Sequence, residues 1–139
     1  NAMSNQYLNP DDLFDARPFG FSQAVVCPAN GTAYLSGQTA WDKSGKLSSG
    51  ADYAAQVPAA LANVVRAAQA VGAKATDVVR VRVYIVNHTP DKLGVLGKAM
   101  ADCFGADALP ASTVIGVAAL ALPELLVEIE ADVSLPPAR

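Results

Sequence analysis

The octapeptide LVEIEADV, residues 126–133, decides the fold. Within it Glu128, Glu130 and Asp132 alternate with apolar residues, and a period of two is the spacing of a β-strand. One face of this strand therefore carries three carboxylates, and the other face is apolar. The pattern predicts a strand whose apolar side packs on a core, and the acidic side faces water, a second subunit or a ligand.

A second stretch, VVRVRVYIV at residues 78–86, offers a partner for this acidic face. Its β-branched residues predict a strand with Arg80, Arg82 and Tyr84 on one face. The opposite face should pack under helices and consists of Val79, Val81, Val83 and Ile85. If both strands share a sheet, two interpretations follow. The charges form an ion-pair ladder that sets the register of an interface, or Glu128 acts as a general base in a cleft between subunits.

The remaining patterns predict an α+β fold, a single mixed β-sheet with two helices packed on one face, in the order ββαβαββ. Residues 23–27 and 32–36 form a hairpin around Asn30-Gly31. One helix spans residues 52–71 with Asp52 as its cap, although Pro58 requires either a separate first turn or a kink. A second helix begins at Thr89-Pro90 and ends near Phe104. Strands at residues 112–117 and 125–133 close the chain, and one sheet face remains bare.

Composition places the 139 residues in one globular domain. Residues 1–3 resemble an expression-tag remnant, which leaves residues 4–139 as the domain. Hydrophobic residues make up 52% of the chain and charged residues only 17%. So few charged residues on a small domain predict that part of its apolar surface is buried by self-association. The longest apolar run, residues 114–122, is too short for a bilayer, and no signal peptide is recognised, so a cytoplasmic location is expected. A net charge of −3 without a basic cluster argues against nucleic-acid binding.

Residue types that bind metals or form covalent intermediates are sparse. His88 is the only histidine, and no His, Cys or carboxylate set has ligand spacing, so no metal is expected. Cys27 and Cys103 lie far apart and are predicted to be free thiols. Ser36 and Thr113 lack the His-Asp partners that a hydroxyl nucleophile requires.

Several motifs together resemble the RidA (YjgF) family of reactive-intermediate imine deaminases, over residues 19–133 in the expected order. These motifs are YLSGQTAWDKSGKL (34–47), AAQVPAALANVVRAAQAVGA (54–73), DVVRVRVYIVN (77–87), LPASTVIGVAAL (109–120) and LVEIEADV. The resemblance implies a chorismate-mutase-like fold and a homotrimer with ligand clefts between subunits. It also implies metal-free and cofactor-free hydrolysis of 2-imino or enamino acids to 2-oxo acids and ammonia. A glutamate corresponding to Glu128 would activate the attacking water.

Three positions depart from the family pattern. Active members clamp the substrate carboxylate with an arginine just after the PA dipeptide, where this chain has Ser112. Phe21 stands where a tyrosine is expected, and Gly97 lies about where an asparagine is expected. Losing a bidentate guanidinium removes about 2 to 3 kcal/mol of binding, roughly a hundredfold in affinity.

Other positions retain the pattern or could compensate for these departures. Ser36, Gly37 and Glu128 are retained, and backbone N–H groups after Gly37 and around Thr113 could hold a small oxyanion. Arg82 and Trp41 are further candidates. Arg82 shares the face of Glu128 but could equally be neutralised by Glu130, and Trp41 could wall a cleft or pack its loop onto the domain.

Two functions remain open on the sequence alone. The first is a RidA-like hydrolase that acts on imines, enamines or a related small carbonyl-type substrate, with Glu128 activating water between subunits. The second is a non-catalytic homotrimer that binds a small ligand, in which Glu128 is an ion-pair partner of Arg80 or Arg82.

Overall fold

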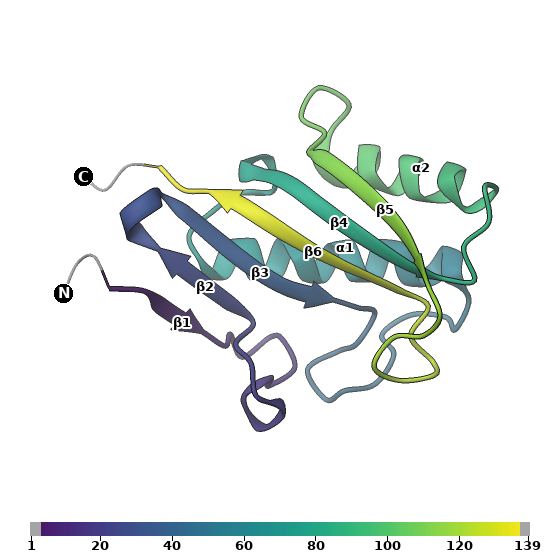
Figure 1. The fold of residues 1–139 in the computed structure, drawn as a ribbon, viewed down its shortest axis with the longest axis horizontal. Coiled ribbons are helices and arrows are strands. Elements are labelled where there is room, and N and C mark those ends of the chain that lie inside the picture. The colour runs from purple at the N-terminus through teal and green to yellow at the C-terminus, as the bar shows by residue number, and fades with distance from the viewer. Residues whose placement is uncertain (1–3, 137–139) are drawn as a thin grey trace.

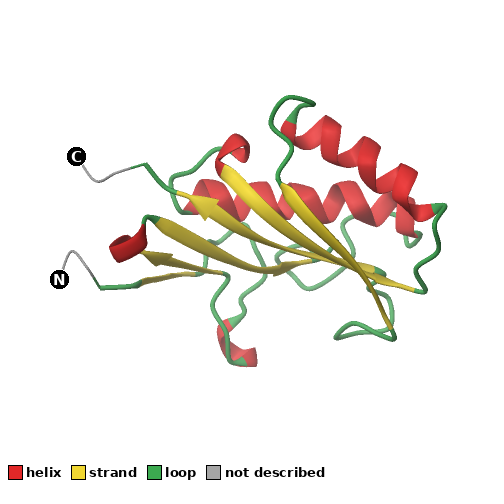
Figure 2. Ribbon diagram, turned by 45° about the horizontal axis from the view of Figure 1, so that its top comes forward, coloured by secondary structure: helices red, strands yellow, loops and turns green. Residues whose placement is uncertain are grey.

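A computed structural model describes residues 4–136, so residues 1–3, the predicted tag remnant, lie outside the described residues. One six-stranded sheet is crossed on a single face by two helices (Figures 1 and 2). The strands lie in the order β1-β2-β3-β6-β4-β5, and only β4 and β5 are parallel neighbours. The predicted α+β class is confirmed. The elements are β1 (Gln6–Leu8), β2 (Ala24–Cys27), β3 (Thr32–Gln38), α1 (Tyr53–Ala70), β4 (Val78–Val86), α2 (Lys92–Phe104), β5 (Ala111–Val117) and β6 (Val127–Ser134).

The predicted element order lacks one strand, because β1 precedes the hairpin and pairs with β2. Its three residues are mostly exposed, so they carry no hydrophobic alternation that a sequence could reveal. The hairpin itself is confirmed as β2 and β3, joined by a short 3-10 turn at Pro28–Asn30. Gly31 ends this turn with a φ of 63°, a conformation that glycine adopts without steric cost.

Both helices form where expected, with a difference at the start of the second. Asp52 caps α1 by accepting a hydrogen bond from the Ala55 N–H, and α1 runs through Pro58, so the first turn is not separate. The second helix begins at Lys92 and not at Thr89-Pro90, which was the prediction. These two residues form a turn instead, whose Thr89 carbonyl accepts from the Lys92 N–H at 3.0 Å.

The core lies between the helices and the sheet. Val57, Leu61 and Val64 of α1 are buried in the core, where α1 packs on β6 and β3. In β4 the predicted face is confirmed for three residues, but Val79 is 49% exposed and Val78 is buried instead. A β-bulge between Val78 and Arg80 puts an extra residue into β4, and such an insertion turns the next side chain to the other face. No helix among the described residues is long and apolar enough to cross a membrane.

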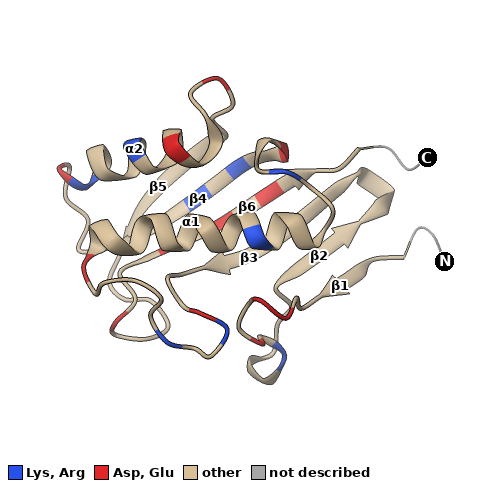
Figure 3. Cartoon of the chain, turned by 180° about the vertical axis from the view of Figure 1, so that it is seen from behind, with Lys and Arg blue, Asp and Glu red and all other residues tan. Residues whose placement is uncertain are grey.

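The other sheet face carries the predicted charge ladder. Arg80 pairs in register with Asp132, Arg82 with Glu130, and Tyr84 with Glu128, and Figure 3 shows basic bands of β4 beside acidic bands of β6. Arg82 forms ion pairs with Glu130 at 3.5 Å and with Asp132 at 3.4 Å. The Tyr84 hydroxyl also donates to Glu130. The guanidinium of Arg82 is therefore engaged by Glu130 and Asp132.

Candidate functional site

A β-bulge in the middle of the sheet shapes the surroundings of Glu128. Leu35 of β3 pairs with Ala131, but the next pair is Gln38 with Ile129, so β3 holds one extra residue at Ser36-Gly37. Gln38 thereby returns to the buried side, while Gly37 lies against the Glu128 side chain. A β-carbon at residue 37 would fall 2.6 Å from the carboxyl carbon and from Oε2. Any residue other than glycine at position 37 would clash with the Glu128 carboxylate in its present position.

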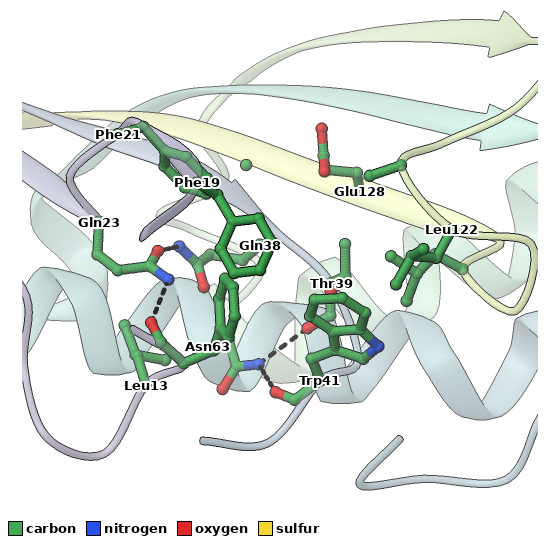
Figure 4. Close-up of a pocket in the computed structure, with 14 residues that line it drawn as sticks. Leu13, Phe19, Phe21, Gln23, Gln38, Thr39, Trp41, Asn63, Leu122 and Glu128 are labelled. Carbon is green, nitrogen blue, oxygen red and sulfur yellow. Dashed lines mark hydrogen bonds between the residues drawn. The ribbon is translucent and has the colours of Figure 1, made fainter. Parts of the chain in front are cut away.

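Beside this carboxylate lies a cavity of about 400 Å³ (Figure 4). Its walls come from the N-terminal loop, the end of β3, one residue of α1, and the loop that leads into β6. Glu128 lies at one side of the cavity on β6, and the rings of Phe19, Phe21 and Trp41 lie around it. The lining residues are Leu13, Phe14, Phe19, Phe21, Gln23, Gly37, Gln38, Thr39, Trp41, Asn63, Ala121, Leu122, Leu125 and Glu128.

The aromatic wall is packed as a unit. The ring of Phe14 lies 5.3 Å from that of Phe19 and 5.2 Å from that of Trp41, the latter edge-on at 69°. Trp41 therefore does both things considered from the sequence, because it packs its loop onto the domain and lines the cavity. Its Nε1 is buried without a hydrogen-bond partner among the described residues.

Side-chain amides tie the N-terminal loop to the bulge. Gln38 Nε2 donates to Gln23 Oε1 at 2.7 Å and to the Ser36 carbonyl at 3.1 Å. Gln23 Nε2 donates in turn to the Phe14 carbonyl at 2.8 Å. The Ser36 hydroxyl donates to the Ser22 carbonyl at 2.6 Å. The Ser36 hydroxyl thus holds the loop and does not line the cavity.

Two buried amides of α1 hold the other walls, and the sequence reasoning missed both. Asn63 Nδ2 donates to the carbonyls of Thr39 at 2.8 Å and Trp41 at 2.7 Å. Gln56 donates to the Glu124 carbonyl at 2.8 Å and accepts from the Leu126 N–H at 3.0 Å. The two amides are seven residues apart, which places them on one helix face. A pair of amides within an apolar stripe is the signal that could have revealed them.

The electrostatics of Glu128 differ from those of its neighbours on β6. Among residues 4–136 the structure gives it neither an ion pair nor a hydrogen bond, although Glu130 and Asp132 both contact Arg82. Burial raises the pKa of the Glu128 carboxyl, and the nearby negative charge of Glu130 raises it further. A carboxylate with an elevated pKa beside an apolar cavity is a suitable proton acceptor in hydrolysis.

The candidate residues fall into two groups in the single chain. Phe21, Gly37, Trp41 and Glu128 line the cavity together. Ser36 lies beside them in the bulge.

The other candidates lie outside the cavity. Arg82 shares the sheet face of Glu128 but is engaged by Glu130 and Asp132. Ser112 and Thr113 lie on the exposed edge strand β5, which β4 separates from β6. Gly97 is exposed on α2, and a β-carbon there would meet no atom within 4 Å. Within one chain these residues do not meet Glu128.

No group of three or more His, Cys, Asp or Glu side chains within residues 4–136 is arranged to hold a metal ion.

Comparison with known proteins identifies the family. The sequence pattern described as Endoribonuclease L-PSP matches residues 15–135. The chain belongs to this family. No curated protein matches it.

Solved structures agree with this assignment. A protein of the conserved Rid family, YyfB from Yersinia pestis, is 42% identical over 96% of this chain and 100% of its own, with a TM-score of 0.71. A member of the YjgF/YER057c/UK114 family from Mycobacterium tuberculosis is 32% identical over 95% of this chain and 100% of its own, with a TM-score of 0.76. RidA from the Antarctic bacterium Psychrobacter is 27% identical over 94% of this chain and 99% of its own, with a TM-score of 0.80. The expected membership of the RidA (YjgF) family is confirmed.

Proposed function

We propose that the protein is a RidA-like hydrolase of small imines, enamines or related carbonyl-type substrates, in which Glu128 activates water. One observation carries this proposal: the unpaired Glu128 carboxylate, with a raised pKa, lies over Gly37 at the wall of an apolar cavity. The Rid family relationship supports a function of this kind at the level of the family.

The chemistry requires one group that accepts and then returns a proton. Ionised Glu128 takes a proton from water while the water oxygen bonds to the carbon of a protonated imine, which gives a neutral carbinolamine. Glu128 then delivers the proton to the amino nitrogen, the C–N bond breaks, and ammonia leaves as Glu128 takes the hydroxyl proton and the oxygen becomes the carbonyl. Transfer of this proton to ammonia gives ammonium and returns Glu128 to its ionised form. The net reaction consumes one water and yields a carbonyl compound and ammonium. An elevated pKa suits both proton transfers, since it lies closer to the pH at which the protein works.

The assembly we propose for this function is a homotrimer formed through the bare sheet face. Tyr34 and Ile115 are exposed and, by register with Asp132 and Tyr84, lie on this face. Exposed apolar residues on an uncovered sheet face favour burial against another copy. Neighbouring copies would then bring β5, with Ser112 and Thr113, towards the cavity.

A second candidate is a homotrimer of the same fold that binds a small ligand without turning it over. Ser112, at the position where the family resemblance places an arginine, favours this alternative because the substrate clamp is missing. The accompanying hypothesis that Glu128 is an ion-pair partner does not fit the geometry, since Arg82 pairs with Glu130 and Asp132. We therefore place the hydrolase first.

Ammonia release from enzymatically generated imines tests the proposal. An amino-acid oxidase supplies a 2-imino acid, and an amine oxidase supplies an imine without a carboxylate. Wild type should accelerate ammonia release from at least one of them, and Glu128→Gln should lose that acceleration while its sedimentation behaviour is unchanged. Ser112→Arg is expected to shift activity towards the imino acid. A wild type that does not accelerate ammonia release from either imine would assign the protein to the ligand-binding alternative. Equal acceleration by wild type and Glu128→Gln would reject Glu128 as the group that activates water.

A further inference from the structure

The cavity beside Glu128 carries a single formal charge. Of its fourteen lining residues, Glu128 alone is charged, and the others are apolar, aromatic or neutral amide and hydroxyl side chains. A half-buried carboxylate has lost part of its hydration, and a cation placed beside it restores the lost stabilisation. A ligand carboxylate in the same space would meet a like charge at low local dielectric and would be disfavoured.

Two of the three side-chain amides that line the cavity, Gln38 and Asn63, have no N–H left for a ligand carboxylate. Both N–H bonds of Gln38 Nε2 are used, by Gln23 and by the Ser36 carbonyl. Both N–H bonds of Asn63 Nδ2 are used by the Thr39 and Trp41 carbonyls. An amide nitrogen has only two protons to donate. The side chains of this cavity thus offer the ligand a charged acceptor at Glu128, whereas the donors that remain, such as Trp41 Nε1 and one N–H of Gln23, are neutral.

Two arginines near the cavity are engaged by other groups. Arg82 contacts Glu130 and Asp132 on the sheet face. Arg66 donates to the Asn63 Oδ1 at 2.9 Å and lines a separate groove that it shares with Asp42 and other acids. Neither side chain lines the cavity.

Aromatic rings complete the recognition surface. Phe19 is 69% exposed and Phe21 is 42% exposed, although both are large apolar residues at the cavity. Trp41 and Leu122 face the same space. Such a surface favours an aromatic or branched apolar group, and ring faces also attract cations.

Building on the proposed function of this site, we propose that its ligands are aromatic or branched apolar amines and the imines derived from them, lacking a carboxylate, with the nitrogen at Glu128 and the apolar group against Phe19, Phe21 and Trp41. The substrate class is then an amine-derived imine rather than an amino-acid-derived one. The product of hydrolysis would be an apolar aldehyde or ketone with ammonia. A reaction that oxidises primary amines would supply such a substrate.

Three probes of similar size and different charge test this assignment: 2-phenylethylamine, 2-phenylethanol and phenylacetate. Trp41 is the only tryptophan of the chain and lines the cavity, so its fluorescence reports occupancy directly. Titration of the full-length wild type should give the tightest Kd for the amine and the weakest for the acid. A hydrogen bond to a charged group corresponds to roughly tenfold to a hundredfold in Kd, which sets the expected gap between amine and alcohol.

A matched pair of variants separates the cavity charge from general effects. Glu128→Gln keeps the shape and removes the charge, so the preference for the amine should collapse to the level of the alcohol. Glu124→Gln makes the same change in the neighbouring loop, at an exposed residue that does not line the cavity, and should keep the preference. Phenylacetate binding as tightly as the amine would overturn the proposal, as would the absence of a Trp41 response to all three probes.

The binding and turnover experiments can reject the proposed ligand class and the proposed hydrolase separately. Amine binding without ammonia release from any imine would keep the ligand class and reject the hydrolase. Ammonia release from a 2-imino acid, together with a preference for phenylacetate, would keep the hydrolase and reject the ligand class.

Discussion

The carboxylate of Glu128 lies over the α-carbon of Gly37, and a β-carbon on residue 37 would fall 2.6 Å from the carboxyl carbon. This contact exists because, in the bulge at Ser36-Gly37, two residues of β3 lie opposite one residue of β6. A bulge that brings a backbone against a side chain fixes where that side chain lies. Gly37 therefore acts as a positioning residue for Glu128.

Replacing Gly37 by alanine should displace the Glu128 carboxylate and leave the fold intact. The atoms that clash are at the far end of a flexible, partly exposed side chain, so the free energy of unfolding should fall by less than about 1 kcal/mol. A misplacement of about 1 Å can lower a rate by about a hundredfold, and the ammonia assay should show a loss of that order. The double variant Gly37→Ala/Glu128→Asp, with a shorter acid, should recover part of the rate. Unchanged turnover in Gly37→Ala would contradict a positioning role.

The glycines of α2 are expected to respond in the opposite way. Gly94 and Gly97 are exposed, and a β-carbon at either would meet no atom within 4 Å. Alanine in a helix interior is more favourable than glycine by about 0.8 to 1 kcal/mol, so each substitution should raise the melting temperature. Gly94→Ala should keep full activity. A selective loss of activity in Gly97→Ala would place Gly97 at a cleft formed with a neighbouring copy.

The pH dependence of activity should report the raised pKa of Glu128. If ionised Glu128 accepts the proton, kcat/KM rises with pH through a pKa above the ordinary value of 4.5. The groups that face this carboxyl are Glu130 on the same strand and Tyr84, its register partner on β4. Glu128→Gln should abolish the acidic limb of the profile. A limb that persists in Glu128→Gln would assign the titration to another group.

The raised pKa of Glu128 also makes the stability of the folded protein depend on pH. The folded protein holds the proton on Glu128 more tightly than the unfolded chain does, so it binds more protons between the two pKa values. Stability must then fall as pH rises through this interval, and the stabilising contribution is complete only below the ordinary pKa. Urea denaturation above the interval should find Glu128→Gln at least as stable as wild type. A wild type that gains stability relative to Glu128→Gln with rising pH would give the opposite sign.

Sequence reasoning succeeded for elements that patterns of period two or 3.6 define, such as β6, β4 and α1. It failed where a single residue breaks the period. The bulge beside Val79 reversed the orientation of that side chain, and no local feature of the valine-rich strand marks the insertion. The acids and arginines of the ladder were assigned correctly to one sheet face, because their alternation is uninterrupted from Arg80 to Tyr84.

The candidate site was predictable only in part, for a similar reason. Glu128, Gly37 and Trp41 belong to motifs that resemble the family, and Phe21 stands where the family has a tyrosine. The structure gathers all four at one cavity. Leu13, Phe14 and Leu122 lie in irregular loops, whose contacts depend on tertiary structure and not on any periodicity. The sequence therefore predicts the Glu128 carboxylate but not most of the residues that line the cavity beside it.

Arg82 is expected to stabilise the sheet by screening Glu130 from Asp132. The side chains of both ion pairs are 24% to 35% exposed, so Arg82→Met should cost only about 1 kcal/mol, measured by urea denaturation, and less at high salt. Losing the guanidinium also leaves the charge of Glu130 uncompensated, which should raise the pKa of Glu128 and move the acidic limb of the activity profile to higher pH. A limb that moves to lower pH would exclude this coupling. Lys98→Met, which breaks the exposed pair with Asp102 on α2, is the control.

Asn63 should prove to be the residue that holds Trp41 at the cavity. Asn63→Ala leaves the Thr39 and Trp41 carbonyls without their buried donor, at a cost of about 2 to 4 kcal/mol. Gln56→Ala removes comparable bonds to Glu124 and Leu126 and should be destabilising to a similar degree.

Asn63→Ala and Gln56→Ala should loosen different sides of the cavity. Asn63→Ala should shift the emission of Trp41 in the folded protein and weaken phenylethylamine binding, because the indole loses the anchor of its own backbone. Gln56→Ala frees the loop before β6 and should leave the resting emission of Trp41 unchanged. Equal shifts of emission in both variants would mean that the tryptophan responds to general loosening of α1, and that Asn63 has no particular hold on the aromatic wall.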